Sequence, residues 1–277
     1  MQIRSDKRRA GRGPNSVAVD FFATPSSVYQ PSVYRQSDLD RSNETVGSIE
    51  LFGLCGARNV FHIKICGIRL KSDIDAIEAA GGDAVGLNFF PKSIRYLDPQ
   101  SASTGELAIY AQKRGLTRVG VFVNESAERI GSISEKKWID VIQLHGDETL
   151  GDAKALAAIR LPILRAIKLP AGPIGVNQID SRIRPWTEAG FGVLLDVDAG
   201  PAHGGSGTAL DWDSLGRWSK ANEDTSWTLA GGLRPDNVAE AINVTGAKSV
   251  DVASGVESPR GKKSATLISE FCRNANP

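Results

Sequence analysis

Short apolar runs alternate with amphipathic stretches from residue 60 almost to the end of the chain. The runs are continuous, without the apolar-polar alternation of a half-exposed strand, which is typical of parallel strands covered on both faces. We expect each run to form a buried strand. The predicted strands are residues 60–66, 84–90, 118–123, 140–144, 162–167, 192–196, 226–230 and 249–252.

Between the predicted strands, apolar residues recur every three or four positions, which indicates amphipathic helices. Ile74, Ile77 and Ala80 mark the first helix in this way. Pro185 interrupts the fifth pattern, and Pro235 suits the first position of the seventh helix. The predicted helices are residues 72–80, 100–114, 127–136, 150–159, 178–188, 212–219, 235–246 and 264–273.

Eight strand-helix units of roughly 27 residues each predict an α/β protein with a single (β/α)8 barrel, the TIM barrel. An open, doubly wound sheet would also fit the alternation. The length and the number of units favour the closed barrel, which also leaves no exposed sheet edge. The barrel domain is predicted to cover residues 59–277.

Residues 1–58 have a different character. A basic cluster at residues 4–12 is followed by a stretch rich in Ser, Pro, Gln, Asn and Tyr at residues 24–44. Such a composition buries too little apolar surface to order the chain, so we expect a disordered N-terminal extension. A basic arm for nucleic acid or an acidic partner, and a start codon placed too far upstream, are the alternatives.

Composition narrows the choice of partners and compartment. The formal net charge of the 277 residues is +1, so we expect neither nucleic acid nor membrane as a partner. Three widely spaced cysteines favour a reducing compartment over a disulfide framework. No apolar run approaches the roughly 20 residues of a membrane span, and no signal peptide is evident. The sequence therefore predicts a cytoplasmic protein.

In a (β/α)8 barrel the loops that follow the strands form the active face, so residues at strand ends are the candidates for chemistry. Cys66 ends the first strand and could act as a base or nucleophile, or simply be a small buried residue. Asp196 ends the sixth and could act as an acid, or as a cap or ion-pair partner. Arg95 could clamp an anion or pair with an acid, and His145 could be catalytic or a hydrogen-bonded loop residue.

Three late loops are rich in glycine, which lets backbone N–H groups approach an anion without a Cβ in the way. Their position matches the phosphate site that many such barrels carry after strands seven and eight. The candidate phosphate-binding residues are Gly205, Ser206, Gly207, Gly231, Gly232, Ser254 and Gly255. No group of histidines, cysteines and acids has the spacing of metal ligands, so no metal or other cofactor is expected.

These motifs, in this order, resemble phosphoribosylanthranilate isomerase of tryptophan biosynthesis. The resemblance covers about residues 60–273. The matching segments are KICGI at 64–68, GGDAVGLNFFPKSIRY at 81–96, VGVFVN at 119–124, DVIQLHGDE at 140–148, LLD at 194–196, GGSG at 204–207, DW at 211–212, LAGGLRPDNV at 229–238 and VDVASGVE at 250–257.

The resemblance implies a cofactor-free Amadori rearrangement of N-(5-phosphoribosyl)anthranilate to 1-(2-carboxyphenylamino)-1-deoxyribulose 5-phosphate. It implies that Cys66 is the general base, that Asp196 is the general acid and that Arg95 binds the anthranilate end. His145 is assigned to substrate binding, and the late loops hold the phosphate. The partner is then a small phosphorylated substrate, and the protein a monomer or homodimer.

The sequence departs from the family pattern at two positions, and neither is the proposed acid or base. Ser264 replaces a frequent aspartate before the last helix, where serine is also a good N-cap, and Ser206 stands where threonine is common. A sugar-phosphate epimerase, an indole-3-glycerol-phosphate synthase and a non-catalytic regulatory barrel remain as alternatives. Activity on a related ribonucleotide of histidine biosynthesis also remains open.

Overall fold

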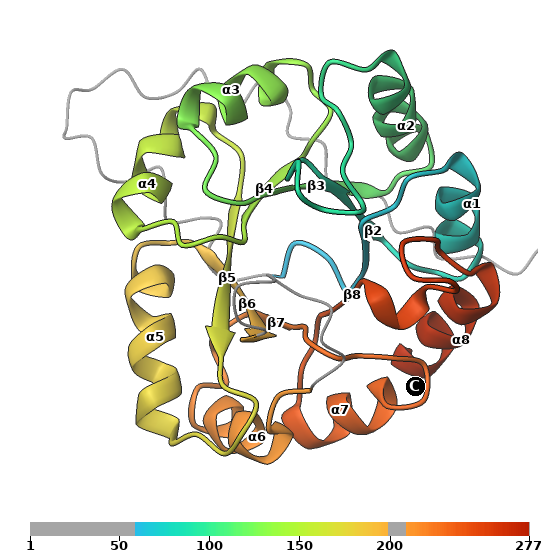
Figure 1. Ribbon diagram of the computed structural model, residues 1–277. Coiled ribbons are helices and arrows are strands. Elements are labelled where there is room, and N and C mark those ends of the chain that lie inside the picture. Colours follow the sequence, from blue (N-terminus) through green and yellow to red (C-terminus); the bar gives the residue numbers. More distant parts are fainter. Residues whose placement is uncertain (1–58, 199–208, 277) are drawn as a thin grey trace, which may run out of the picture. The chain divides into compact units, whose positions relative to one another are not determined.

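The computed structural model describes residues 59–198 and 209–276. In this part of the chain, eight parallel strands pair in sequence order and close into a barrel, with β8 returning to β1. Figure 1 shows the helices as an outer ring around these strands. The prediction of a (β/α)8 barrel is confirmed, and the open sheet is wrong. The predictions made for residues 1–58 lie outside the described residues.

The strands and helices alternate strictly. The strands are β1 Ile63–Cys66, β2 Ala84–Asn88, β3 Thr117–Phe122, β4 Val141–Leu144, β5 Ile163–Leu169, β6 Gly192–Val197, β7 Trp227–Leu229 and β8 Val250–Val252. The helices are α1 Lys71–Ala79, α2 Ala102–Lys113, α3 Ala127–Glu135, α4 Leu150–Ala155, α5 Val176–Glu188, α6 Trp212–Ala221, α7 Val238–Thr245 and α8 Ala265–Ala275. Two 3-10 turns, η3 Leu156–Ile159 and η5 Ser254–Val256, follow α4 and β8.

Strand β1 begins three residues later than predicted. Just before it and at its first residue, the side chain of Asp83 accepts the backbone hydrogen bonds that a neighbouring strand would otherwise accept. The carboxylate of Asp83 accepts hydrogen bonds from the backbone N–H groups of His62 and Ile63, both at 2.7 Å. Helix α7 likewise begins at Val238, so the prediction that Pro235 opens it is wrong. The side chain of Asn237 accepts a hydrogen bond from Arg234 N at 2.7 Å and so closes a turn there.

Helix α5 continues through Pro185, where the sequence pattern predicted an interruption. Proline removes one helical hydrogen bond, but Ile179, Ile183 and Trp186 are buried against the barrel on either side of it. Packing of that apolar face holds the helix together. The expected cap of the last helix is confirmed, since Ser264 Oγ accepts a hydrogen bond from Leu267 N.

The apolar core has two parts. The larger lies between the strands and the surrounding helices. A smaller, separate cluster draws on strands all around the ring and fills the barrel interior, as expected for this fold. Its buried members are Phe61, Ala84, Val119, Val141, Leu164, Ala166, Leu194 and Ala230. No helix in the described part of the chain is long and apolar enough to cross a membrane.

Candidate active site

One pocket gathers the C-terminal ends of most strands and the loops that follow them. It is lined by every predicted site residue that the structure describes: Cys66, Arg95, His145, Asp196, Gly231, Gly232, Ser254 and Gly255. The predicted residues Gly205, Ser206 and Gly207 lie outside the described residues. Positions up to 189 residues apart along the chain therefore share one site, as the barrel topology requires.

Cys66 is the last residue of β1 and is only 9% exposed. Its thiol occupies space that Gly86 of β2 leaves open, since a Cβ on Gly86 would lie 2.6 Å from Sγ. Burial raises the pKa of this thiol, whereas the positive charges of Lys64, Lys263 and Arg95 act in the opposite direction. Cys66 is therefore a pocket-lining thiol among cations, which goes beyond the role of a small core residue.

Arg95 enters the pocket from the loop after β2 and is held by an acid. Its Nε and Nη2 donate to the two carboxylate oxygens of Glu257 at 2.6 and 2.8 Å, and Lys263 Nζ donates to the same carboxylate at 2.9 Å. Burial by itself would raise the pKa of Glu257, but the bonds from Arg95, Lys263 and Gly261 lower it to about 2. Arg95 Nη1 has no hydrogen-bond partner among the described residues and is left for a ligand.

Asp196 lies at the end of β6, on a different strand of the barrel from Cys66. It makes polar contacts that differ from those of Arg95. Its Oδ1 accepts a hydrogen bond from Val197 N at 2.8 Å, and its Oδ2 lies 3.4 Å from His145 Nε2. Gln143 Nε2 lies 3.0 Å from His145 Nδ1. An amide that donates to Nδ1 leaves Nε2 as the ring nitrogen that carries a proton, and Nε2 faces Asp196.

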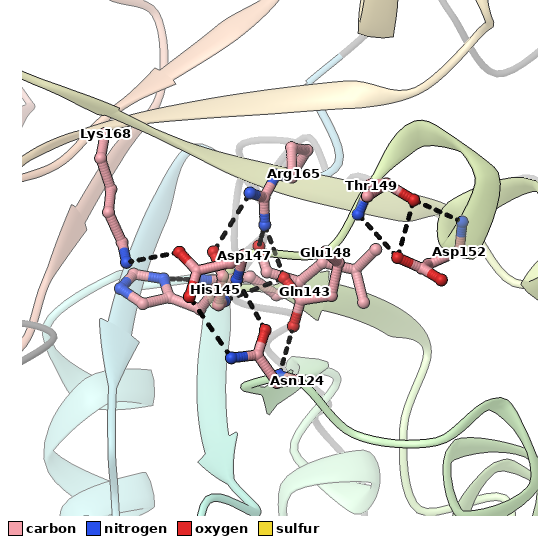
Figure 2. Close-up of polar contacts among 11 residues, drawn as sticks. Asn124, Gln143, His145, Asp147, Glu148, Thr149, Asp152, Arg165 and Lys168 are labelled. Carbon is pink, nitrogen blue, oxygen red and sulfur yellow. Dashed lines mark hydrogen bonds and ion pairs between the residues drawn. The ribbon is translucent and has the colours of Figure 1, made fainter.

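The loop that carries His145 is fixed by a buried network, which Figure 2 shows. Glu148 accepts hydrogen bonds from Asn124 N at 2.7 Å and Gly146 N at 2.9 Å. Arg165 of β5 donates to Glu148 at 2.6 Å and to the carbonyl oxygen of Gly146 at 3.1 Å. Loops after β3 and β4 are thus tied to β5, and His145 is held facing Asp196.

Gly231 and Gly232 form the loop after β7, and both have positive φ, at 84° and 68°. Their N–H groups donate no hydrogen bond within the described residues, which leaves them free for an anion. Gly231 has a second, steric reason to be glycine. A Cβ there would lie 2.9 Å from Asp196 Oδ1 and 2.8 Å from Val197 N. The phosphate-site prediction stays untested, but the loop has the free donors that it requires.

Several polar residues around the pocket received no role from the sequence. They are Lys64, Gln143, Asp251, Glu257 and Lys263. One signal was available for two of them: Lys64 and Asp251 are charged residues inside otherwise apolar strands. No set of three or more histidine, cysteine and acidic side chains that could hold a metal ion occurs in residues 59–198 and 209–276.

The closed barrel and its pocket at the C-terminal ends of the strands define a class of protein, the (β/α)8 barrels that carry an active site at this end. The comparison with known families is more specific. The family model described as N-(5'phosphoribosyl)anthranilate (PRA) isomerase matches residues 63–274. The chain belongs to this family, and its activity is that of an isomerase of tryptophan biosynthesis.

Individual relatives agree with the family match. The chain is 38% identical to the N-(5'-phosphoribosyl)anthranilate isomerase of Neisseria meningitidis serogroup B over 213 residues, which is 77% of this chain and 95% of that protein. It is 40% identical to the enzyme of that name from Myxococcus xanthus over 215 residues, covering the same shares. The crystal structure of the Thermotoga maritima isomerase is similar with a TM-score of 0.66 and 31% identity, over 78% of this chain and 98% of that one.

Proposed function

We propose that the protein isomerises N-(5'-phosphoribosyl)anthranilate by acid–base catalysis, with Cys66 as the base and Asp196 as the acid. One observation carries the assignment. A buried thiol on β1 and a carboxyl group on β6 line the same pocket, with free loop amides and an arginine around them. Two groups with opposite tasks, held in different surroundings, are what a proton-shuttling isomerisation needs.

The first step is ring opening. Asp196 donates its proton to the furanose ring oxygen, and the bond between that oxygen and C1 breaks. The nitrogen lone pair forms a double bond to C1, which leaves a cationic iminium. His145 orients the acid through its Nε2, which lies 3.4 Å from Asp196 Oδ2.

The second step is proton removal from carbon. The iminium makes the C2 proton acidic, and the Cys66 thiolate accepts it. The electrons of the C2–H bond form a C1–C2 double bond, and the nitrogen regains its lone pair. The resulting enolamine becomes the ketone when C1 gains a proton and the C2 hydroxyl loses one. Cys66 gives its proton to C1, and Asp196 accepts the proton of the C2 hydroxyl. Both groups are then restored for the next turnover.

The two ends of the substrate are held away from the reacting carbon atoms. Arg95 Nη1 would donate to the anthranilate carboxylate while Glu257 holds the rest of the guanidinium, which is how a fork-shaped donor gains geometric precision. The phosphate would accept hydrogen bonds from Gly231 and Gly232. Binding at these ends supplies orientation for the chemistry between them.

A ligand complex of a similar protein supports the kind of molecule that we propose for this pocket. One solved phosphoribosyl anthranilate isomerase, 31% identical with a TM-score of 0.63, is in complex with reduced 1-(o-carboxyphenylamino)-1-deoxyribulose 5-phosphate. We propose that this chain binds the same kind of molecule, with a carboxylate at one end and a phosphate at the other. A monomeric or homodimeric state and a cytoplasmic location stay predictions.

The test is a fluorescence assay of anthranilate-containing substrate with the purified full-length protein. Conversion of N-(5'-phosphoribosyl)anthranilate without added metal or cofactor is expected. Turnover of the related ribonucleotide of histidine biosynthesis in its place, or no turnover of either compound, would contradict the assignment.

A further inference from the structure

Lys64 lies in the interior of the barrel with none of its surface exposed to solvent. It precedes Cys66 by two positions on β1. Side chains two apart on a strand point to the same face, so the ammonium group and the thiol both face the barrel interior. A fully buried lysine is rare, and the mechanism above does not use it.

Asp251 of β8 is the ion-pair partner of Lys64. The two residues are directly paired across the β1–β8 closure of the barrel, and Lys64 Nζ lies 2.8 Å from Asp251 Oδ1. Asp251 also lines the active-site pocket. The pairing of β1 with β8 therefore places the buried Lys64–Asp251 ion pair close to Cys66, the thiol that the mechanism requires as a base.

This ion pair leaves the ammonium group unsatisfied. Despite the short Nζ–Oδ1 distance, neither atom has a partner with hydrogen-bond geometry within the described residues. A buried pair of this kind contributes little to stability, since desolvation offsets its attraction and apolar residues of similar volume often serve as well. Lys64 instead keeps N–H donors available for a second anion.

We propose that Lys64 is a positioning residue whose buried ammonium group stabilises Cys66 as the thiolate, with Asp251 holding that ammonium group in place. The inference rests on the role of Cys66 as the base. The charge of Lys64 favours the ionised sulfur before the substrate binds, and the lost proton leaves to water through the pocket. After the thiolate accepts the C2 proton, the Lys64–Asp251 pair remains as a neutral unit.

The charges around both groups agree with this assignment. Burial would lower the pKa of Lys64, but attraction to Asp251 and Cys66 raises it, so the side chain stays protonated. Burial raises the pKa of the Cys66 thiol, Lys64 is the strongest opposing influence, and the charge of Asp251 raises this pKa by less than Lys64 lowers it. The charged or titratable groups of the described residues that face Cys66 or its pocket come from six of the elements and loops around it. They are Lys64 of β1, Asp251 of β8, Lys92 and Arg95 after β2, Glu257, Arg260 and Lys263 after β8, Asp196 of β6 and His145 after β4.

The test compares the unmodified protein, Asp251→Asn and the double variant Lys64→Met/Asp251→Asn. The two variants differ by the lysine alone, the double variant contains no buried charge that has lost its partner, and the unmodified protein gives the midpoint with the ion pair intact. The rate at which iodoacetamide alkylates Cys66 is measured from about pH 6 to about pH 10.5 by mass spectrometry of the peptide that carries this residue. Circular dichroism and binding of the reduced product analogue check that both variants are folded.

Removal of Lys64 is expected to move the alkylation midpoint upward by about one pH unit or more, a tenfold loss of thiolate at neutral pH. The alkaline rise of kcat/KM is expected to move with it. An unchanged midpoint in the double variant would overturn the proposal. A shifted midpoint together with full turnover by Cys66→Ala would support thiolate stabilisation and contradict the proposed function, so the two failures are distinguishable.

Discussion

The two sides of the active-site pocket differ in the kind of polar contact that they contain. We name the two sides after the proposed roles. The base side consists of Cys66 with Lys64, Asp251, Arg95, Glu257 and Lys263, and the acid side consists of Asp196 with His145 and Gln143. The base side is dominated by ion pairs, two of them almost fully buried. On the acid side, the polar contacts of Asp196 within the described residues are one backbone N–H group and an imidazole.

The difference agrees with the task that we propose for each group. A buried thiol resists ionisation, so a base made from it needs positive charge nearby to become a thiolate. An acid has to carry its proton until the sugar oxygen takes it, which a fixed cation in direct contact would hinder. The pocket keeps the cations around Cys66 in contact with acids, so their charge is localised on one side.

The largest expected effects come from removing the proton-transfer groups themselves. Cys66→Ala and Asp196→Asn should each lower kcat by about 10²–10⁴-fold, since each removes a general base or acid. Steady-state fluorescence assays of both variants measure this. Both should still bind the reduced product analogue, because neither residue holds the phosphate or the carboxylate. Turnover near that of the unmodified protein in either variant contradicts the assignment of that side.

A smaller loss is expected from crowding the acid side. Gly231→Ala places a methyl group 2.9 Å from Asp196 Oδ1 at a φ of 84°, so the carboxylate has to move. Displacement of a reacting group lowers kcat by on the order of 10- to 100-fold. Gly81→Ala is the matched control, with a φ of 81° and no atom within 4 Å of the added Cβ.

Gly81→Ala should lose about 1–2 kcal/mol of stability through backbone strain, measured by urea denaturation. Gly231→Ala should lose more, because its added Cβ also clashes with Val197 N and Asp196 Oδ1. Only Gly231→Ala should lose turnover beyond that. Equal kcat in the two variants would show that the acid side tolerates displacement of its carboxylate.

The base side is probed through the geometry of its arginine. Arg95→Lys keeps the charge but cannot hold Glu257 with two donors while offering a third to a carboxylate. We expect KM to rise about tenfold, equivalent to about 1.4 kcal/mol, with a smaller change in kcat. Arg69→Lys serves as the control, because that arginine is exposed and its side chain donates, within the described residues, only to the carbonyl oxygen of Ile94. Equal KM values in the two variants would exclude Arg95 from substrate binding.

The smallest effect concerns stability in acid. The folded-state pKa of Glu257, about 2, lies below the ordinary value of 4.5. Its contribution is therefore fully present above pH 4.5 and is lost as the pH falls toward 2. Glu257→Gln should cost about 1–2 kcal/mol at neutral pH, and less as the pH falls through this window. Denaturation midpoints of both proteins across the window test this, and a constant difference would contradict it.

The sequence predicted the barrel because buried parallel strands and amphipathic helices leave distinct local patterns. It also predicted which strand ends would meet, since the topology fixes that once the strands are counted. It missed contacts that depend on side chains far apart in the chain. Asp83 shortens β1 from 20 residues away, and Glu257 holds Arg95 from 162 residues away. No local pattern marks either contact.

The pairing of Lys64 with Asp251 shows the same limit in a different form. Both residues are charged positions within apolar strands, but their pairing depends on the register in which β1 and β8 close the barrel. Likewise, Gly231 was assigned to the phosphate from its loop type alone. Only the coordinates show that it also makes room for the carboxylate of Asp196.

The central claim is that one thiol and one carboxyl group act on neighbouring atoms of the same sugar. A crystal structure of this protein with the reduced product analogue tests it most directly. We expect Cys66 Sγ at about 3–3.5 Å from C2 and a carboxyl oxygen of Asp196 at a similar distance from the oxygen released by ring opening. An analogue bound with its ribulose chain against only one of the two side chains, or outside the pocket, would contradict the claim.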